Sequence, residues 1–212
     1  MTSGLNMKDI AYSVIKNKIL TNEFISGQYL EEKMLCELVG VSRTPIREAV
    51  RQLEVEGFLQ TKMSKGIFVT TIGVEETKDL FQARMLVEPI VLELAWTYLE
   101  ILPLEELCQK TQSAILIEDF QELNELDYEF HNYINSHCPN SIMMNIVNQI
   151  QDQFQRVRTL NYYDHDRILG GAHEHIALVQ TFRENNIEKA KDLLLQHIQN
   201  TKKYYYMSLM NQ

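Results

Sequence analysis

Two groups of residues have the types and spacing that chemistry needs, one in each half of the chain. In the first half, Arg43, Arg47 and Arg51 recur every four residues. On a helix, residues four apart lie one above the next, so the three guanidinium groups would form a stripe that no acidic residue shares. Such a stripe suits a polyanion such as a phosphate backbone, and the alternative is a solvated basic face.

The residues around this stripe predict the helix that carries it. Ser42 is a favoured N-cap, and Pro45 falls in the first turn, where a missing backbone N–H costs no hydrogen bond. Four apolar residues recur at helical spacing and would be buried on another face: Ile46, Ala49, Val50 and Leu53. The first turn adds unpaired N–H groups and the positive end of the helix dipole, which suit phosphate. DNA is therefore the candidate partner.

The second group consists of one carboxylate and three imidazoles. Asp127 and His131 are four apart and would face the same way on one helix, while His175 and His197 lie in the apolar patterns of two later helices. Three helices could thus converge on one divalent ion of borderline softness, such as zinc, nickel, manganese or iron, with positions left for water or a ligand. A single histidine on an apolar face is more often a hydrogen-bonded core residue, so spacing alone leaves both interpretations open.

The distribution of charge separates the two halves. Residues 1–72 carry 9 Lys and Arg against 8 Asp and Glu, which leaves 11 basic and 21 acidic residues for 73–212. The net charge of −9 therefore lies in the second half, which would repel DNA, so only the first half is expected to contact phosphate. With 212 residues, 45% of them apolar, the chain is long enough to build two cores.

Cysteine usage and hydropathy point to the cytoplasm. Cys36, Cys108 and Cys138 form neither a CxxC pair nor an even disulfide framework, which favours a reducing compartment. The start, Met1–Asn6, has no basic stretch followed by an apolar core, and no apolar run reaches the length of a membrane span. We expect a cytoplasmic protein with no membrane partner.

The first seventy residues read as a winged helix-turn-helix. Amphipathic helices are expected over Asp9–Thr21 and Leu30–Leu38, and the turn at Gly40 leads straight into the arginine helix. Two strands, Phe58–Thr61 and Gly66–Thr71, would then form a hairpin. Helix, tight turn and helix is the arrangement that lays the second helix in a major groove, and the basic hairpin tip, with Lys62 and Lys65, could reach phosphates or a minor groove.

From Val74 onward the helical period replaces strand signals. Breaks are expected at Pro89, at Ile101-Leu102-Pro103, at Cys138-Pro139-Asn140 and at Gly170-Gly171. The expected helices are Val74–Glu88, Pro89–Glu100, Leu104–Glu118, Gln121–Ser136, Ser141–Asn161, Arg167–Asn185 and Ile187–Met210. The prediction is a mainly α protein, with a winged helix-turn-helix domain over 1–72 and an all-α helical bundle over 73–212.

The run VSRTPIREAVRQLEVEG, together with the glycine of the hairpin, resembles the DNA-binding domain of the GntR family of bacterial transcription regulators. The resemblance extends over Asp9–Thr71. By position it implies five DNA-contacting residues: Lys33, Arg43, Thr44, Arg47 and Lys65. Met63 stands where some members have a polar residue, which departs from the pattern for reading a minor groove.

Residues from about Glu76 to Tyr204 resemble the FCD ligand-binding domain of the FadR subfamily. In its metal-binding members an Asp-x3-His pair and two later histidines coordinate the ion, and DYEFH and EHIALVQTFRENNIEKAKDLLLQHI place these at Asp127, His131, His175 and His197. His173 would point away. Arg84 matches a family arginine four residues before a glutamate, here Glu88. It is either a helix ion pair or a fork for a ligand carboxylate.

Together these resemblances imply a homodimeric transcription regulator and not an enzyme. The all-α domain would bind the effector and form the dimer, and the commoner family pattern is a repressor that its ligand releases from operator DNA. The implied effector is a small organic acid held at a divalent metal, preferably zinc. Two alternatives remain: a regulator that senses the metal itself, and a metal-dependent enzyme, for which no separate general base or nucleophile stands out.

Overall fold

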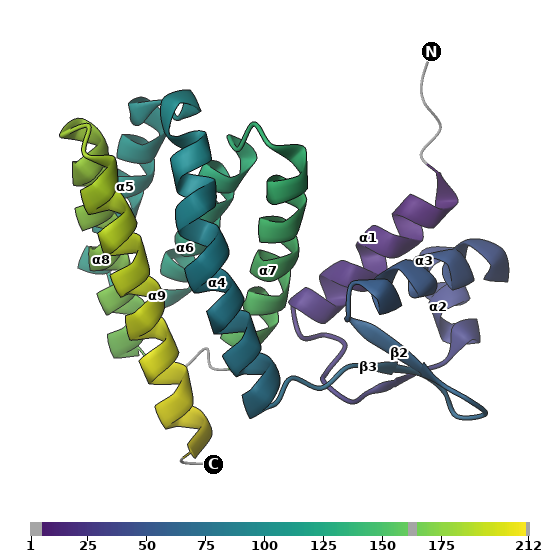
Figure 1. Cartoon of the computed structure of the whole chain (residues 1–212). Helices are drawn as coiled ribbons and strands as arrows, with labels where there is room; N and C mark the ends of the chain where they lie inside the picture. The colour runs from purple at the N-terminus through teal and green to yellow at the C-terminus, as the bar shows by residue number, and fades with distance from the viewer. Residues whose placement is uncertain (1–5, 161–164, 211–212) are drawn as a thin grey trace. The chain divides into compact units, whose positions relative to one another are not determined.

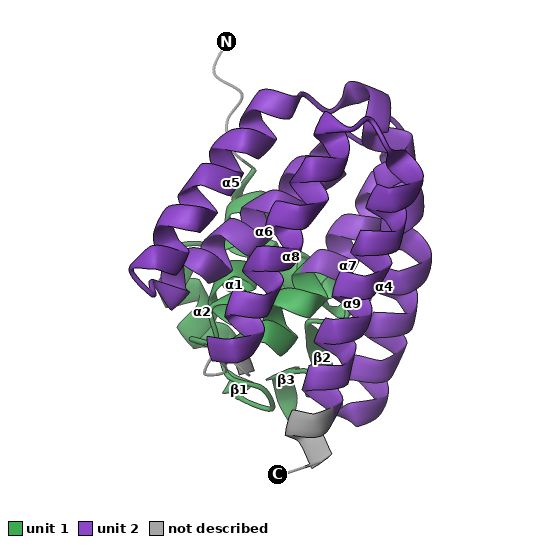
Figure 2. Ribbon diagram, turned by 90° about the vertical axis from the view of Figure 1, so that its left-hand side faces the viewer, with its two compact units in different colours: residues 1–73, 152–160 green, residues 74–151, 161–212 purple. Residues whose placement is uncertain are grey.

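The computed structural model describes residues 6–160 and 165–210 of the chain. It divides into two compact units, which Figure 2 shows in different colours. The first consists of residues 1–73 with 152–160, and the second of 74–151 with 161–212. One helix, α7 (Ser141–Leu160), therefore contributes residues to both units.

The first unit is a winged helix-turn-helix, as predicted. It contains α1 (Met7–Leu20), α2 (Glu32–Val39), α3 (Arg43–Val55) and strands β1 (Tyr29–Leu30), β2 (Leu59–Lys62) and β3 (Gly66–Val69) (Figure 1). The strands form an antiparallel sheet in the order β1-β3-β2. Strand β1 was not predicted, and Leu30, expected at a helix start, pairs with Ile67 instead. Two residues are too few to show the alternation by which a strand is recognised.

The apolar face of α3 forms the centre of this unit. Ile46, Ala49, Val50 and Leu53 are all buried, and α3 packs against α1. Gly40 ends α2 in a left-handed conformation (φ +75°), which an L side chain rarely adopts. Ser42 occupies the N-cap position as predicted, but its side chain makes no capping hydrogen bond. With this face buried, the arginine stripe lies at the surface.

The wing depends on a glycine. Gly66 has a φ of +97°, and a Cβ at this position would lie 2.5 Å from a ring atom of Tyr29. The Tyr29 ring lies 5.4 Å from that of Phe68, and the Lys62 ammonium lies 5.1 Å from the Phe68 ring centre. Glycine is thus required both by its backbone angle and by the aromatic ring that covers it.

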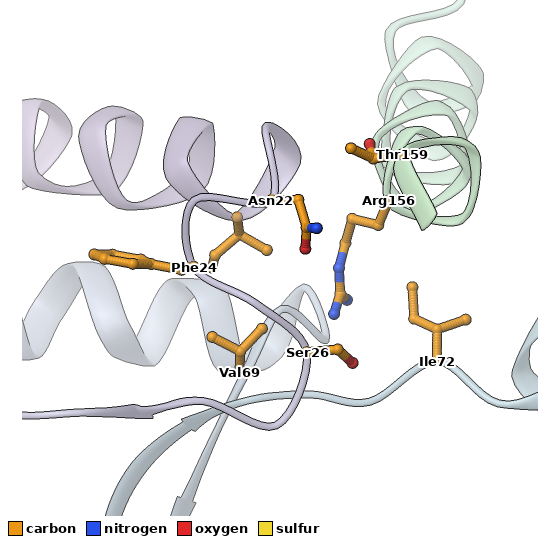
Figure 3. A pocket seen from close by; sticks show the side chains of 8 residues that line it. Asn22, Phe24, Ser26, Val69, Ile72, Arg156 and Thr159 are labelled. Carbon is orange, nitrogen blue, oxygen red and sulfur yellow. The ribbon is translucent and has the colours of Figure 1, made fainter. Parts of the chain in front are cut away.

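Residues 152–160 of α7 complete the first unit. Arg156 is buried, and its Nη2 and Nη1 donate to the carbonyl (2.6 Å) and hydroxyl (3.0 Å) of Thr70. Burial lowers the pKa of Arg156 to about 10, so the guanidinium remains charged at neutral pH. Gln153 donates to the carbonyl of Glu56 at 2.8 Å. The pocket beside Arg156, shown in Figure 3, has a volume of about 10 Å³, close to the limit for a single water.

The second unit is all-α within the described residues, which confirms the predicted class. Besides the first part of α7, its elements are α4 (Val74–Ala95), a 3-10 helix (Trp96–Tyr98), α5 (Ile101–Leu116), α6 (Phe120–Ser136), α8 (His165–Arg183) and α9 (Ile187–Met210). Helix α9 packs against α4 and α8, and α5 packs against α6 and α8 (Figure 1). No helix within residues 6–160 and 165–210 combines the length and apolar character needed to cross a membrane.

Two predicted helix breaks were wrong, and a third was misplaced because α5 already begins at Ile101 and includes Pro103 in its first turn. Helix α4 continues through Pro89, and α8 continues through Gly170 and Gly171. A proline removes one N–H from the helix ladder, but Pro89 is buried beside Val91 and Leu92, and packing of this face offsets the local cost. The predicted end of α7 at Asn161 lies outside the described residues.

The Arg156 contacts predict a stability effect. Arg156→Met keeps much of the volume but removes the donors to Thr70, and a lost charged hydrogen bond in a buried site costs about 1–3 kcal/mol. The free energy of unfolding, measured by urea titration, should fall by this amount. Gln149→Ala, at an exposed position of the same helix, is the matched control and should leave it unchanged. Equal effects of the two variants would contradict this role for Arg156.

Candidate functional site

The four predicted metal ligands come together in the second unit. Asp127, His131, His175 and His197 each offer one ligand atom, and these atoms all lie within 4.8 Å of one another. The three histidines are buried, and the Asp127 side chain is 21% exposed. The cluster draws on α6, α8 and α9. This grouping of one carboxylate and three imidazoles is the donor set of a borderline divalent ion.

Helical spacing and apolar packing position these groups. Asp127 and His131 lie one turn apart on α6, on the side that buries Leu126 and Phe130. The Phe130 ring stacks on the His175 ring at 4.3 Å between centres, which fixes one face of that imidazole. The ring centres of His175 and His197 are 4.6 Å apart. The imidazoles of His175 and His197 thus lie close together, with Phe130 covering one face of His175.

The electrostatic environment keeps His197 neutral. Burial lowers the pKa of His197 well below its usual value, and the nearby His175 and His131 lower it further. Neutral imidazole is the form that ligates a metal. His197 therefore presents a lone pair at neutral pH, as a cation site requires.

A second carboxylate fixes the orientation of His197. Glu174 on α8 places its Oε2 atom 2.7 Å from Nδ1 of His197. Because a carboxylate oxygen accepts, Nδ1 carries the hydrogen, and the lone pair of Nε2 remains for a ligand. Glu174 is itself held by Asn200 Nδ2 (2.7 Å) and Arg167 Nη1 (3.0 Å). This network was not predicted, and its one sequence signal is that Glu174 precedes a candidate ligand.

Arg84 forms a buried ion pair that leads to the same cluster. Its Nε and Nη2 atoms lie 2.5 and 3.4 Å from the two Glu88 oxygens, and its side chain is 0% exposed. Glu88 Oε2 lies 3.5 Å from Nδ1 of His131. The ion-pair interpretation of Arg84 thus agrees with the geometry, but the pair is interior and not a weak surface contact. A role for Arg84 in binding a carboxylate stays a prediction. His173 is exposed, as expected.

The predicted DNA-contacting residues all lie on the surface of the first unit. Arg43, Thr44 and Arg47 are exposed on the first turns of α3. Lys33 is exposed on α2, with Nζ 3.8 Å from Glu37, and Lys65 is exposed in the turn between β2 and β3. Helix α3, α2 and the wing are therefore the elements that would present cations to a nucleic acid. Glu32 of α2, which contacts two of these arginines, was missed by the sequence analysis.

Comparison with known proteins decides the family. The family described as bacterial regulatory proteins, gntR family, matches residues 8–69, and the FCD domain matches residues 79–200. The chain belongs to the GntR family. This GntR-family member is therefore a DNA-binding transcription regulator with an FCD effector-binding domain, and neither matched family is one of enzymes.

Other GntR-type regulators resemble it over most of their length. The chain is 29% identical to the uncharacterized HTH-type transcriptional regulator YdhC of Bacillus subtilis, covering 88% of this chain and 85% of that protein. It is 29% identical to the Nta operon transcriptional regulator of Aminobacter aminovorans, with 83% of each covered. The solved structure of E. coli McbR/YncC has the same fold, with a TM-score of 0.83, 19% identity and 96% and 99% of the two chains covered.

The buried position of Arg84 predicts a large effect of breaking its ion pair. Arg84→Met would leave the Glu88 carboxylate buried without its cation, and such a change costs about 3–5 kcal/mol. Adding Glu88→Leu should restore much of the free energy of unfolding. Lys78→Met on the same helix breaks the exposed Lys78–Glu75 pair and should change little. Thermal and urea unfolding of Arg84→Met, Glu88→Leu, their double variant and Lys78→Met would measure this, and additive effects of the two single substitutions in the double variant would contradict it.

Proposed function

We propose that this GntR-family regulator is a homodimeric repressor of the FadR subfamily, whose operator binding is controlled by a small organic acid held at a divalent metal. The proposal rests on the convergence of Asp127, His131, His175 and His197 within the FCD domain. We assign operator binding to residues 1–72, and effector binding and dimerisation to 73–212. Operator binding would place it in the cytoplasm.

The donor set favours zinc, nickel, manganese or iron, with zinc preferred. Four protein ligands can leave coordination positions to a ligand, and the partly exposed Asp127 marks the more accessible side of the cluster. When bound, the ion would supply a positive charge that attracts a carboxylate. A carboxylate at the His131 side of the cluster would compete with Glu88 for the fork of Arg84. After such an exchange Arg84 would contact the organic acid in place of Glu88. The contacts inside the domain would then differ between the acid-bound and acid-free states.

Homodimer formation would connect effector and operator. Half-sites on DNA repeat about every 34–36 Å, so two recognition helices must be held at that spacing. Exposed apolar side chains on α4 and α7 offer a surface for a second copy: Leu86, Ile90, Ile142 and Ile146. Val91 of α4 packs with Val147 of α7, so these two helices are neighbours in the second unit. An acid that stabilised one dimer arrangement would change operator affinity by linkage.

A second candidate is that the metal itself is the signal. The observation that favours it is the buried pair of Arg84 with Glu88, because the arginine proposed for the carboxylate already holds one. In that case, metal loss at physiological metal concentrations would change operator affinity, and no organic acid would be needed.

Substitution of Arg47 tests the operator-contact assignment. With an operator selected from random DNA by the full-length protein, Arg47→Ala should weaken binding about 5- to 150-fold if the arginine reads a base, and Arg43→Ala should behave similarly. Lys110→Ala removes an exposed positive charge from the second unit and should leave operator affinity unchanged. Fluorescence anisotropy titrations measure both. An unchanged Arg47→Ala titration would remove this residue from the interface.

Thermal melts test the metal and the organic acid together. A ligand that binds the native state stabilises it by about 2.7 kcal/mol at a hundredfold excess over its dissociation constant. Protein as purified and protein after chelation should be melted against a panel of mono-, di- and tricarboxylates. We expect one acid to raise the melting temperature only when metal is present, and to lower operator affinity.

Two variants make these melts specific to the cluster. His175→Ala should abolish metal retention and the acid-dependent shift, whereas His173→Ala, at the exposed histidine two residues away, should preserve both. If chelation alone changes operator affinity and no acid shifts the melt, the metal-sensing alternative replaces the organic acid. If the protein as purified carries no metal and none restores a shift, the metal-centred function is wrong.

A further inference from the structure

One carboxylate of the DNA-binding unit contacts two arginines of the recognition helix α3. Glu32 Oε2 lies 2.8 Å from Arg47 Nε, and Glu32 Oε1 lies 3.2 Å from Arg47 Nη2. The same Oε1 atom lies 3.5 Å from Nε of Arg43. The side chains of Arg43 and Arg47 are 73% and 60% exposed, whereas that of Glu32 is 27% exposed. The carboxylate therefore lies beneath two exposed guanidinium groups.

The contact to Arg47 uses a particular edge of the guanidinium. A guanidinium carries five N–H donors, and the pair formed by Nε and one hydrogen of Nη2 faces Glu32. The edge formed by Nη1 and the other hydrogen of Nη2 is not used by this carboxylate. That edge has the spacing that matches the O6 and N7 acceptors of guanine in the major groove.

From this geometry we propose that Glu32 is a positioning residue for sequence reading, which orients Arg47 toward a guanine and restrains it from nearby phosphates. The inference rests on the proposed role of Arg47 in the operator interface. Two physical effects act in the same direction. Holding a long side chain in one conformation before binding reduces the entropy lost when it contacts a base. The negative charge of Glu32 also repels phosphates, so it disfavours contacts that carry no sequence information.

The surroundings of Glu32 support a fixed and ionised carboxylate. It is the first residue of α2, where the positive end of the helix dipole stabilises a negative charge. The hydrogen bond from Arg47 lowers the pKa of Glu32, so the carboxylate is ionised at neutral pH. An exposed ion pair adds little to folding stability, so a contribution to stability does not by itself account for this contact.

The same helix offers a matched control. Glu37 is an exposed glutamate near the other end of α2, and the structure pairs it with Lys33 at 3.8 Å instead of with an arginine of α3. Replacing either glutamate removes one negative charge from α2. Glu32 and Glu37 therefore separate an orienting contact from a general change of charge.

The experiment compares specific with non-specific binding by the full-length protein. Glu32→Gln, Glu32→Ala and Glu37→Gln would be titrated by anisotropy against the selected operator, against operators with each G·C pair replaced by A·T, and against unrelated duplex. We expect Glu32→Ala to lower the ratio of operator to non-specific affinity about tenfold, with non-specific affinity unchanged or raised. Glu37→Gln should keep the ratio. In an Arg47→Ala background, Glu32→Ala should have no further effect on the ratio of operator to non-specific affinity.

Four outcomes would overturn the proposal. If Glu32→Ala raises operator and non-specific affinity by the same factor, Glu32 is only a counter-charge. If its effect persists in the Arg47→Ala background, it acts through another residue. If Arg47→Ala keeps the ratio of operator to non-specific affinity, the operator role of Arg47 is wrong, and the inference about Glu32 fails with it. If Arg47→Ala loses this ratio but Glu32→Ala keeps it, only the inference about Glu32 is wrong. Circular dichroism and thermal melts would establish that each variant is folded.

Discussion

The helical unit is constrained by the burial of charged and polar side chains in an apolar bundle. Arg84, Glu88 and three histidines are buried inside it, where water does not solvate their polar groups. A buried charge without a partner is costly, and here Arg84 pairs with Glu88, which also faces His131. On the other side of the cluster, His197 is held by Glu174. These contacts orient the imidazoles of His131 and His197, and the Phe130 ring stacks on that of His175. The geometry of the cluster therefore depends on the same contacts that satisfy the polar groups buried in the bundle.

In the DNA-binding unit, the two faces of α3 have different roles. Ile46, Ala49, Val50 and Leu53 anchor the helix in the core, which leaves its arginines in solvent. Exposed arginines are flexible and bind any phosphate, so a rigid helix alone does not discriminate between DNA sequences. The contact with Glu32 restrains Arg47 without burying it. Affinity for DNA and selectivity among DNA sequences would thus have separate structural origins in this unit.

Features that depend on local spacing could be predicted from the sequence. The four-residue step from Asp127 to His131 placed both on one helix face, and the face formed by Ile46, Ala49, Val50 and Leu53 was predicted as buried. The family resemblances added the partners of Asp127 and His131 on other helices. The unpredicted features depend on tertiary contacts. Glu174 acquires its role only because α8 packs against α9, and Pro89 is tolerated only because its helix face is buried.

The contribution of α7 to the DNA-binding unit limits where recombination could exchange the FCD domain of this regulator. The gntR match ends at residue 69 and the FCD match contains residues 152–160, yet these residues fold with the first unit. Arg156 and Gln153 supply donors to the carbonyls of Thr70 and Glu56. A recombination event that joined residues 1–73 to a foreign FCD domain would lose these donors unless the new domain carried equivalent ones. The boundary at which evolution can exchange sensors in this protein therefore does not coincide with the boundary between its two sequence families.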